Sequence, residues 1–238
     1  RVHLQYHHLD ILADGQLLVI ARRGSVEHLY LLDGKGGHRE IDAGAVSYGS
    51  VVPQPDALYF TAGFAGRPAA LAKATWRGEI AAIVRSARDD ALPPSLVPAF
   101  EQVSFPLPDG GEAHGVYLPP TNPAVAPPAE GAPPLIVTVH GGPTSVAGVS
   151  YAPELYYWTS RGFAVLDLNY RGSTGFGREY RRALYGNWGI ADVEDAVAGS
   201  RWLAQQGLAD PQRLIIRGGS AGGYTTLAVH AFDDAFAA

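Results

Sequence analysis

The first 92 residues have the hydrophobic pattern of short strands separated by tight turns. The apolar runs cover residues 16–21, 28–32, 46–52, 57–62 and 69–74. Turn signals such as Asp14-Gly15 and Asp33-Gly34 lie between these runs. The spacing predicts antiparallel meanders, equivalent to about two four-stranded β-propeller blades, although a strand-rich sandwich would have the same pattern.

The hydrophobic pattern changes from residue 93 onward. This change begins in a linker at residues 91–98, which contains three prolines. The predicted strands are residues 101–106, 112–118, 135–139, 163–169 and 214–216, and the predicted helices are residues 153–161, 192–206 and 221–232. Residues 119–134 are rich in Pro and Ala, and we expect a surface loop there. The alternation of strands and helices predicts the α/β class, with a mostly parallel, helix-covered sheet.

The predicted helix at residues 192–206 has one buried face and an acidic first turn. The residues at helical spacing on that face are Val193, Ala196, Val197, Ser200 and Leu203. Asp192, Glu194 and Asp195 lie in the first turn, where carboxylates complement the helix dipole. We therefore interpret these three carboxylates as structural.

The strongest chemical signal is an apolar run that breaks into glycines around one serine. Residues 214–216 are typical of a buried strand, residues 218–223 are Gly-Gly-Ser-Ala-Gly-Gly, and a predicted helix follows. This order is typical of a nucleophile elbow, in which Gly218 and Gly222 must be small. We predict that Ser220 is a nucleophile. A glycine-rich turn that binds phosphate or nothing is the alternative, although the lysine of a phosphate loop is missing.

A serine nucleophile also needs hydrogen-bond donors for the oxyanion. The predicted strand at 135–139 is followed by His140-Gly141-Gly142-Pro143. In an α/β-hydrolase, the loop after the corresponding strand donates a backbone N–H to the oxyanion. We predict the N–H groups of Ala221 and Gly142 as donors, with Gly141 less favoured. An ordinary turn would have the same sequence. His140 precedes the serine, whereas this fold orders its triad serine, acid, histidine, so we assign His140 to shaping the loop.

The catalytic acid and base are expected outside these residues. The only histidine after Ser220 is His230, and a rise of ~1.5 Å per residue places it about 15 Å away along a helix. Asp233 and Asp234 fail as the acid for the same reason. The sequence contains no methionine, so we expect it to be a piece of a longer protein. We expect this piece to be inactive alone because it lacks the catalytic acid and base. We also expect the strand at 214–216 to present an unpaired edge.

Composition narrows the classes of partner. The 238 residues are 47% hydrophobic with a net charge of -5, and no basic cluster stands out beyond Arg178–Arg182, which we interpret as a solvated helix face. This argues against nucleic acid or a membrane as partner. The absence of cysteine fits a cytoplasmic protein. His3, His7 and His8 with Asp10 are interpreted as surface or packing residues, so we predict no metal and no cofactor.

Four motifs together resemble the prolyl oligopeptidase family of serine peptidases, peptidase family S9. The motifs are residues 218–224, residues 140–143, Asn169-Tyr170-Arg171-Gly172-Ser173-Thr174-Gly175-Phe176-Gly177, and Trp188-Gly189 with Asp192-Val193-Glu194-Asp195. The likeness covers residues 135–238 and is greatest to the acylaminoacyl-peptidase and dipeptidyl-aminopeptidase branch. It implies that residues 93–238 are the N-terminal half of an α/β-hydrolase domain, truncated after the elbow. Residues 1–92 would then be the last blades of a β-propeller.

The resemblance also implies a function and a cleft. Ser220 would form an acyl-enzyme with short peptides, and His140, Arg171 and Tyr224 would lie at the substrate cleft, with Arg171 either a structural anchor or a charge partner. The missing C-terminal half of the domain would be a partner, and a homo-oligomer stays open. The alternatives are an esterase or lipase of the same fold, or a catalytically dead propeller–hydrolase that serves as a binding scaffold.

Overall fold

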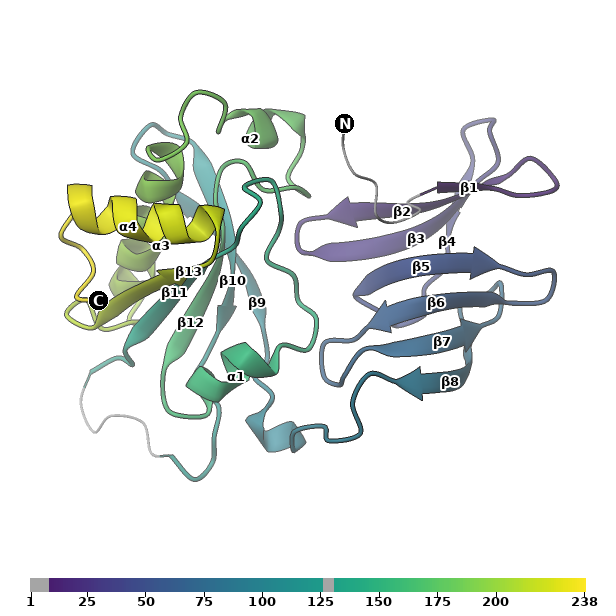
Figure 1. The fold of residues 1–238 in the computed structure, drawn as a ribbon, viewed down its shortest axis with the longest axis horizontal. Coiled ribbons are helices and arrows are strands. Elements are labelled where there is room, and N and C mark those ends of the chain that lie inside the picture. Colours follow the sequence, from purple (N-terminus) through teal and green to yellow (C-terminus); the bar gives the residue numbers. More distant parts are fainter. Residues whose placement is uncertain (1–8, 126–130) are drawn as a thin grey trace. The chain divides into compact units, whose positions relative to one another are not determined.

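The computed structural model describes residues 9–125 and 131–238, which divide into two compact units (Figure 1). Unit 1 extends to Leu92 and also contains Val149–Tyr151, whereas unit 2 comprises Pro93–Gly148 and Ala152–Ala238. No sequence pattern predicts the return of residues 149–151 to unit 1. Two hydrogen bonds hold this return: the Tyr151 N–H donates to the Phe64 carbonyl at 2.8 Å, and the Leu92 N–H donates to the Tyr151 hydroxyl at 2.8 Å.

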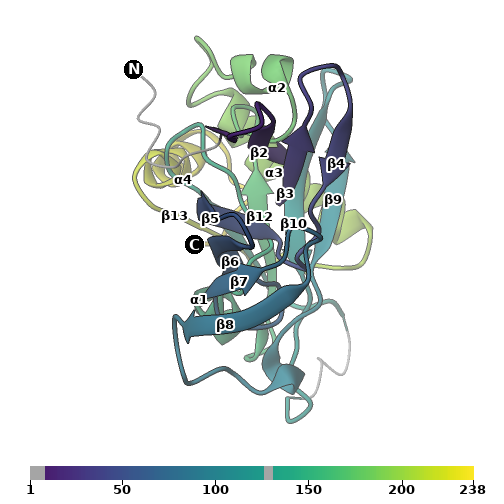
Figure 2. The same ribbon diagram turned by 90° about the vertical axis from the view of Figure 1, so that its right-hand side faces the viewer.

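Unit 1 contains two four-stranded antiparallel sheets, each a meander in chain order. The strands are β1 (Leu9–Ile11), β2 (Leu17–Arg23), β3 (Val26–Leu32), β4 (His38–Glu40), β5 (Ser47–Pro53), β6 (Leu58–Gly63), β7 (Ala70–Ala74) and β8 (Ile80–Ser86). Figure 2 faces the second sheet, with β5 to β8 side by side. The five predicted strands are confirmed as β2, β3, β5, β6 and β7. The pattern does not predict the edge strands β1, β4 and β8, because they are short or mostly exposed and lack apolar alternation.

One hydrophobic core joins the two sheets of unit 1. Leu29 from β3 and Phe60 from β6 are both fully buried in it. A buried carboxylate also links the sheets, because Glu27 on β3 accepts the Tyr48 N–H of β5 at 2.7 Å and pairs with Arg22. Charged hydrogen bonds of this kind compensate the cost of burying a carboxylate.

Unit 2 is built on a five-stranded mixed sheet in the order β13-β11-β12-β10-β9. Its strands are β9 (Glu101–Pro106), β10 (Glu112–Leu118), β11 (Leu135–Val139), β12 (Ala164–Asn169) and β13 (Leu214–Gly218). β11 lies parallel to both β12 and β13, and β9 and β10 form an antiparallel hairpin. The prediction of this hairpin is confirmed. The expected mostly parallel sheet is confirmed only in part, because β10 pairs antiparallel with β12 as well as with β9.

Helices lie on both faces of this sheet. α3 (Ala191–Gln205) and α4 (Ala221–Phe232) cover one face, and α1 (Pro153–Thr159) lies on the other (Figure 1). The predicted inward face of α3 is confirmed, since Val193, Ala196 and Leu203 are buried. The short α2 (Arg178–Arg182) exposes its arginines, and a 3-10 turn, η1, spans Pro94–Leu96. Residues 126–130 of the predicted loop at 119–134 lie outside the described residues.

The expectation of an unpaired edge at β13 is wrong. The Ile216 N–H donates to the Ala238 carbonyl at 2.8 Å, and the Ala237 N–H donates to the Leu214 carbonyl at 2.9 Å. Phe236 is buried in the core beneath α3 and α4, which holds this last segment against the strand. The chain therefore covers that edge with its own residues 237–238 by turning back after α4.

The face of the sheet that carries α1 contains a row of polar residues. Thr138 on β11 lies directly beside Asp167 on β12 and Arg217 on β13 in the strand register. Among the described residues, the buried hydroxyl of Thr138 has no hydrogen-bond partner. Burial, and next the charge of Glu154 on α1, raise the pKa of Asp167 to about 7. The folded chain therefore holds the proton of Asp167 more tightly than the unfolded chain, where the pKa is near 3.8.

This raised pKa predicts a pH-dependent loss of stability. The contribution of Asp167 is fully present below pH 4, and it is lost as the pH rises toward 7 because the folded state then has to bury a charge. Asp167→Asn is expected to remove that fall and to raise the free energy of unfolding at pH 8 by on the order of 3 kcal/mol. Urea unfolding at pH 4 to 8 measures both effects, with Asp234→Asn as an exposed control. Identical pH slopes in wild type and Asp167→Asn would contradict the prediction.

Candidate functional site

The elbow forms between β13 and α4, at the carboxyl end of the parallel strands. Ser220 has φ 54° and ψ -118°, a backbone conformation that L-residues rarely adopt and that costs about 1–3 kcal/mol. The residue is exposed, and α4 begins directly after it at Ala221. The strand, strained serine and helix therefore follow one another as the sequence predicts.

Two glycines make this turn sterically feasible. A Cβ atom on Gly222 would lie 2.0 Å from the carbonyl oxygen of Val139, at the end of β11. A Cβ atom on Gly218 would lie 2.4 Å from the backbone carbonyl group of Gly222. By contrast, a Cβ atom on Gly219 would meet nothing within 4 Å. The elbow therefore requires glycine at both flanking positions that the motif singled out, but not at the position directly before the serine.

The loop after β11 lies against the serine. A Cβ atom on Gly141 would lie 3.3 Å from the Cβ and 3.9 Å from the Oγ of Ser220. Gly142 has φ +127°, and a Cβ there would lie 2.8 Å from the Thr144 nitrogen, so this position also needs glycine. Ala221 opens α4, and the first N–H groups of a helix have no partner within it. The candidate oxyanion donors Gly142, Gly141 and Ala221 thus belong to two segments that meet at Ser220.

His140 supports this loop from beneath. Its ring stacks on that of Tyr170, with centroids 4.5 Å apart, and the Tyr170 hydroxyl donates to the His140 carbonyl at 3.2 Å. Nδ1 lies 2.8 Å from the Gly141 carbonyl and Nε2 lies 2.8 Å from the Ser173 hydroxyl. Burial lowers the pKa of His140, with the Gly141 hydrogen bond opposing, so the ring is neutral at pH 7. Because a carbonyl only accepts, the bond to Gly141 requires the ring proton on Nδ1. The Ser173 hydroxyl has one proton and lies near two acceptors, Nε2 of the neutral ring and the Tyr170 carbonyl at 2.7 Å.

Arg171 is held by three carboxylates. Its Nε donates to Asp195 at 2.8 Å, and its terminal nitrogens contact Glu194 at 2.8 Å and Asp109 at 3.1 Å. The Arg171 N–H also donates to Asp195 at 2.6 Å. Of the two roles left open for Arg171, these contacts favour the structural anchor, which ties the loop after β12 to α3 and to the β9–β10 turn.

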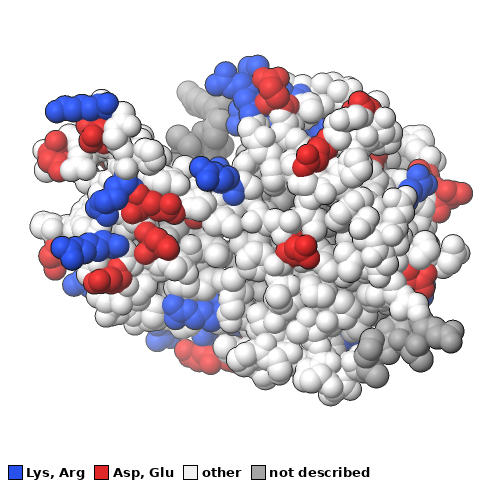
Figure 3. All heavy atoms as spheres, turned by 180° about the vertical axis from the view of Figure 1, so that it is seen from behind, with Lys and Arg blue, Asp and Glu red and all other residues white. Residues whose placement is uncertain are grey.

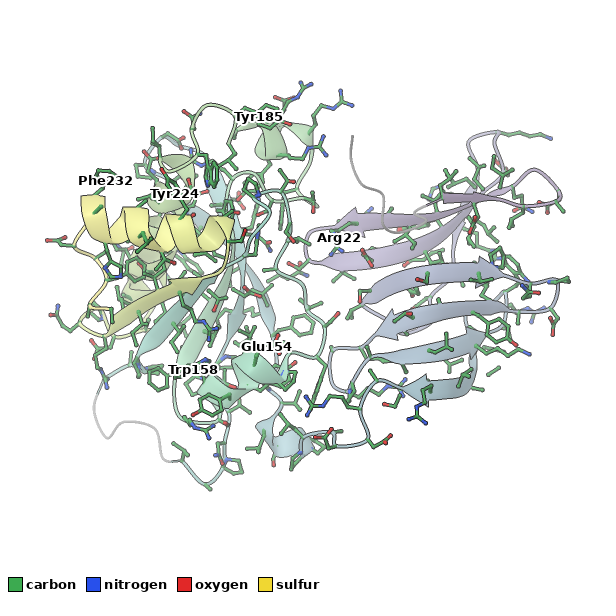
Figure 4. All side chains as sticks on the ribbon, viewed as in Figure 1. Arg22, Glu154, Trp158, Tyr185, Tyr224 and Phe232 are labelled. Atoms are coloured by element: carbon green, nitrogen blue, oxygen red, sulfur yellow. The ribbon has the colours of Figure 1, made fainter. Side chains whose placement is uncertain are left out.

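Tyr224 lies one helical turn after Ser220 and is half-exposed (Figure 4). Its ring packs against Trp188, with centroids 5.0 Å apart, and its hydroxyl lies close to Gly189. α4 also exposes the apolar side chains of Leu227 and Phe232. Tyr224 therefore belongs to an aromatic surface beside the elbow, which the motif Trp188-Gly189 helps to form.

No described histidine of unit 2 is placed to take a proton from Ser220. Both ring nitrogens of His140 are engaged elsewhere, and His230 lies exposed at the far end of α4. His114 bonds Ser104 across the β9–β10 hairpin. Asp192 and Asp195, which we interpreted as dipole partners, are instead buried and bonded to specific groups. The motifs contain these residues and Tyr170 and Ser173, but nothing in the sequence predicts their contacts.

Within residues 9–125 and 131–238, no group of His, Cys, Asp or Glu side chains is arranged to hold a metal ion. No helix in that same part of the chain is both long and apolar enough to cross a membrane. His3, His7 and His8 lie outside the described residues. Basic and acidic side chains are interspersed on the face seen in Figure 3.

Comparison with known proteins finds a family model, curated relatives and solved structures that are similar to parts of this chain. Residues 149–238 match the prolyl oligopeptidase family. Dipeptidyl aminopeptidase BIII of Pseudoxanthomonas mexicana is 40% identical over 105 residues, 44% of this chain and 15% of that protein. The acylamino-acid-releasing enzyme of Arabidopsis thaliana is 41% identical over 93 residues, 39% of this chain and 12% of that protein. The structure of a Mycobacterium tuberculosis puromycin-hydrolyzing peptidase matches with TM-score 0.90 and 35% identity, over 97% of this chain and 35% of that one.

The resemblance predicted from the four motifs is therefore confirmed. The chain matches 15% or less of the length of either curated relative, and 35% of the solved peptidase. The site described above accordingly represents one part of what those longer proteins contain.

The glycine contacts predict a sharp difference between neighbouring substitutions. Gly222→Ala forces its methyl group onto the Val139 carbonyl, so we expect a loss of about 2–3 kcal/mol or more in the free energy of unfolding. Gly219→Ala, three residues away, has open space and should change stability by about 0.5 kcal/mol or less. Urea unfolding of the two variants tests this, and equal stabilities would show that α4 does not approach β11 as described.

Proposed function

Residues 149–238 match the prolyl oligopeptidase family, and on that premise we propose that the protein is a serine peptidase acting on short peptides through Ser220. The observation that carries the proposal is the juxtaposition of an exposed serine on a strained elbow with a glycine loop from the neighbouring strand. An esterase would need the same elbow. The names of the matched relatives, an aminopeptidase, an acylamino-acid-releasing enzyme and a puromycin-hydrolyzing peptidase, favour amide bonds.

In the proposed reaction, the Ser220 hydroxyl attacks the substrate carbonyl and forms a tetrahedral intermediate. The N–H groups of Ala221 and Gly142 stabilise its oxyanion, and loss of one such donor typically costs about 3 kcal/mol in the transition state. A histidine takes the serine proton and returns it to the leaving amine, and water then releases the acyl group. Since unit 2 places none of its described histidines at Ser220, we propose that this base and its acid partner come from outside residues 1–238.

Unit 1 has a proposed role in the choice of substrate. Its two successive four-stranded meanders are consistent with blades of a β-propeller, and we propose that they are part of one that limits access to the serine. Such a filter would admit oligopeptides and exclude folded proteins. Peptides are then the proposed partners, no cofactor is required, and the absence of cysteine is consistent with a cytoplasmic location.

Covalent labelling of the full-length protein tests the proposal. A fluorophosphonate is expected to modify Ser220 and to abolish hydrolysis of a short peptide amide. Ser220→Ala should lose the label and at least three orders of magnitude of kcat, because the acyl-enzyme cannot form. Ser160→Ala, at the end of α1, is a control that should retain both.

Two results would count against the proposal. A full-length protein whose Ser220 resists the reagent would act as a scaffold rather than an enzyme, since an unactivated serine does not react. Amide hydrolysis by residues 1–238 alone would contradict the assignment of the base to a region outside them.

A further inference from the structure

We propose that Asp192 is a positioning residue that holds the elbow helix α4, and with it the candidate oxyanion donor Ala221, in place through Thr225. This inference rests on the proposed function of Ser220. Asp192 itself touches neither Ser220 nor the candidate donors. A buried set of hydrogen bonds connects Asp192 on α3 to α4, the helix that follows the elbow.

The carboxylate of Asp192 is fully buried and uses both oxygens. Oδ1 accepts the Gly189 N–H at 2.6 Å, and Oδ2 accepts the hydroxyl proton of Thr225. Thr225 is also fully buried. The bond to Gly189 fixes the turn directly before α3, because Asp192 lies in the first turn of that helix. The second bond goes to a different helix, so Asp192 also connects α3 to α4.

Thr225 transmits this constraint to a candidate oxyanion donor. Its hydroxyl lies 3.2 Å from the carbonyl of Ala221, one turn earlier in α4, but it has a single proton. A hydrogen bond to a carboxylate is the stronger one, so the proton goes to Asp192. The first turn of α4 is then attached to α3 on the side of the helix that also contacts Val139, since Gly222 and Thr225 are three residues apart. This packing contact and this hydrogen bond together give the Ala221 N–H a defined direction.

The direction of the Ala221 N–H matters for the proposed reaction, because Ala221 opens α4 and is one of the candidate oxyanion donors. A misplacement of about 1 Å in such a site can lower the rate by 10²-fold.

The other carboxylates in the first turn of α3 do not share this arrangement. Glu194 is half-exposed and pairs with Arg171, and Asp195 is buried but also bonds Arg171. Only Asp192 among the three bonds a residue of α4. The chain therefore separates the two tasks within one turn, with Asp195 anchoring the loop after β12 and Asp192 anchoring the elbow helix.

Substitutions in the full-length protein test the proposal. Asp192→Asn keeps an oxygen for the Gly189 N–H but replaces the acceptor of the Thr225 proton with an amide N–H₂. Thr225→Val removes the hydroxyl at nearly constant shape, and Thr225→Ser keeps it. We expect kcat to fall about 10- to 100-fold in Asp192→Asn and Thr225→Val, with KM changed less than about threefold. Thr225→Ser and the exposed control Asp234→Asn should stay within about twofold of wild type.

The rate of fluorophosphonate labelling and hydrogen–deuterium exchange distinguish positioning from folding. Labelling, normalised to folded protein, should slow in parallel with kcat. Exchange in the peptide covering residues 219–226 should rise in Asp192→Asn and Thr225→Val but not in Thr225→Ser. If Asp192→Asn does not fold, Thr225→Val carries the same test.

Each outcome bears on one of the two proposals. Wild-type kcat and labelling per folded molecule in Asp192→Asn and Thr225→Val, together with unchanged exchange at residues 219–226, would overturn the positioning role even if stability fell. A wild-type full-length protein that neither hydrolyses peptides nor labels at Ser220 would overturn the proposed function, and with it the catalytic meaning of Asp192. Loss of kcat in Thr225→Ser as large as in Thr225→Val would overturn the role of the hydroxyl.

Discussion

The site depends on the close approach of α4 to the end of β11. Gly222 lies so near the Val139 carbonyl that a single methyl group would not fit between them. The parallel register pairs Val139 with Gly218, so the two strands end side by side and their following loops meet. Ser220 and Gly141 come together at that point. Without this backbone contact, the serine and the glycine loop would be separate turns at the edge of a sheet.

Next to the elbow, buried polar groups hold the loop at residues 140–143, which carries the candidate oxyanion donors, in one conformation. His140 is held between the Gly141 carbonyl and the Ser173 hydroxyl, and Tyr170 bonds its carbonyl from below. Arg171, the next residue, is anchored by Asp195 and its neighbours. Satisfied networks of this kind are rigid because an unmade bond in the interior is costly. Rigid donors are what stabilisation of a developing oxyanion requires.

The two units contribute different kinds of order. Unit 2 combines a parallel core with an antiparallel hairpin, and its carboxyl-end loops carry the candidate chemistry. Unit 1 consists of two meanders around a shared core, with Glu27 bonded across both sheets. The match to the Mycobacterium tuberculosis peptidase extends over 97% of this chain, so both units have counterparts in that structure. The proposed division into a catalytic part and an access filter follows these two architectures.

The sequence alone determined the elements whose signal is local. Alternation and apolar runs located β9 to β13, helical spacing located α3, and the order of strand, glycines, serine and helix located the elbow. Only the tertiary structure decided which distant residues meet. The return of residues 149–151 to unit 1, the pairing of residues 237–238 with β13, the three carboxylates around Arg171 and the bond from Thr225 to Asp192 leave no periodic trace. Thr225 and Asp192 are 33 positions apart, and a contact at that separation depends on how helices pack rather than on the preference of either residue. The candidate nucleophile Ser220 was therefore predictable from the sequence, whereas the buried contacts around the candidate oxyanion donors depend on the packing of α3 and α4 on the sheet.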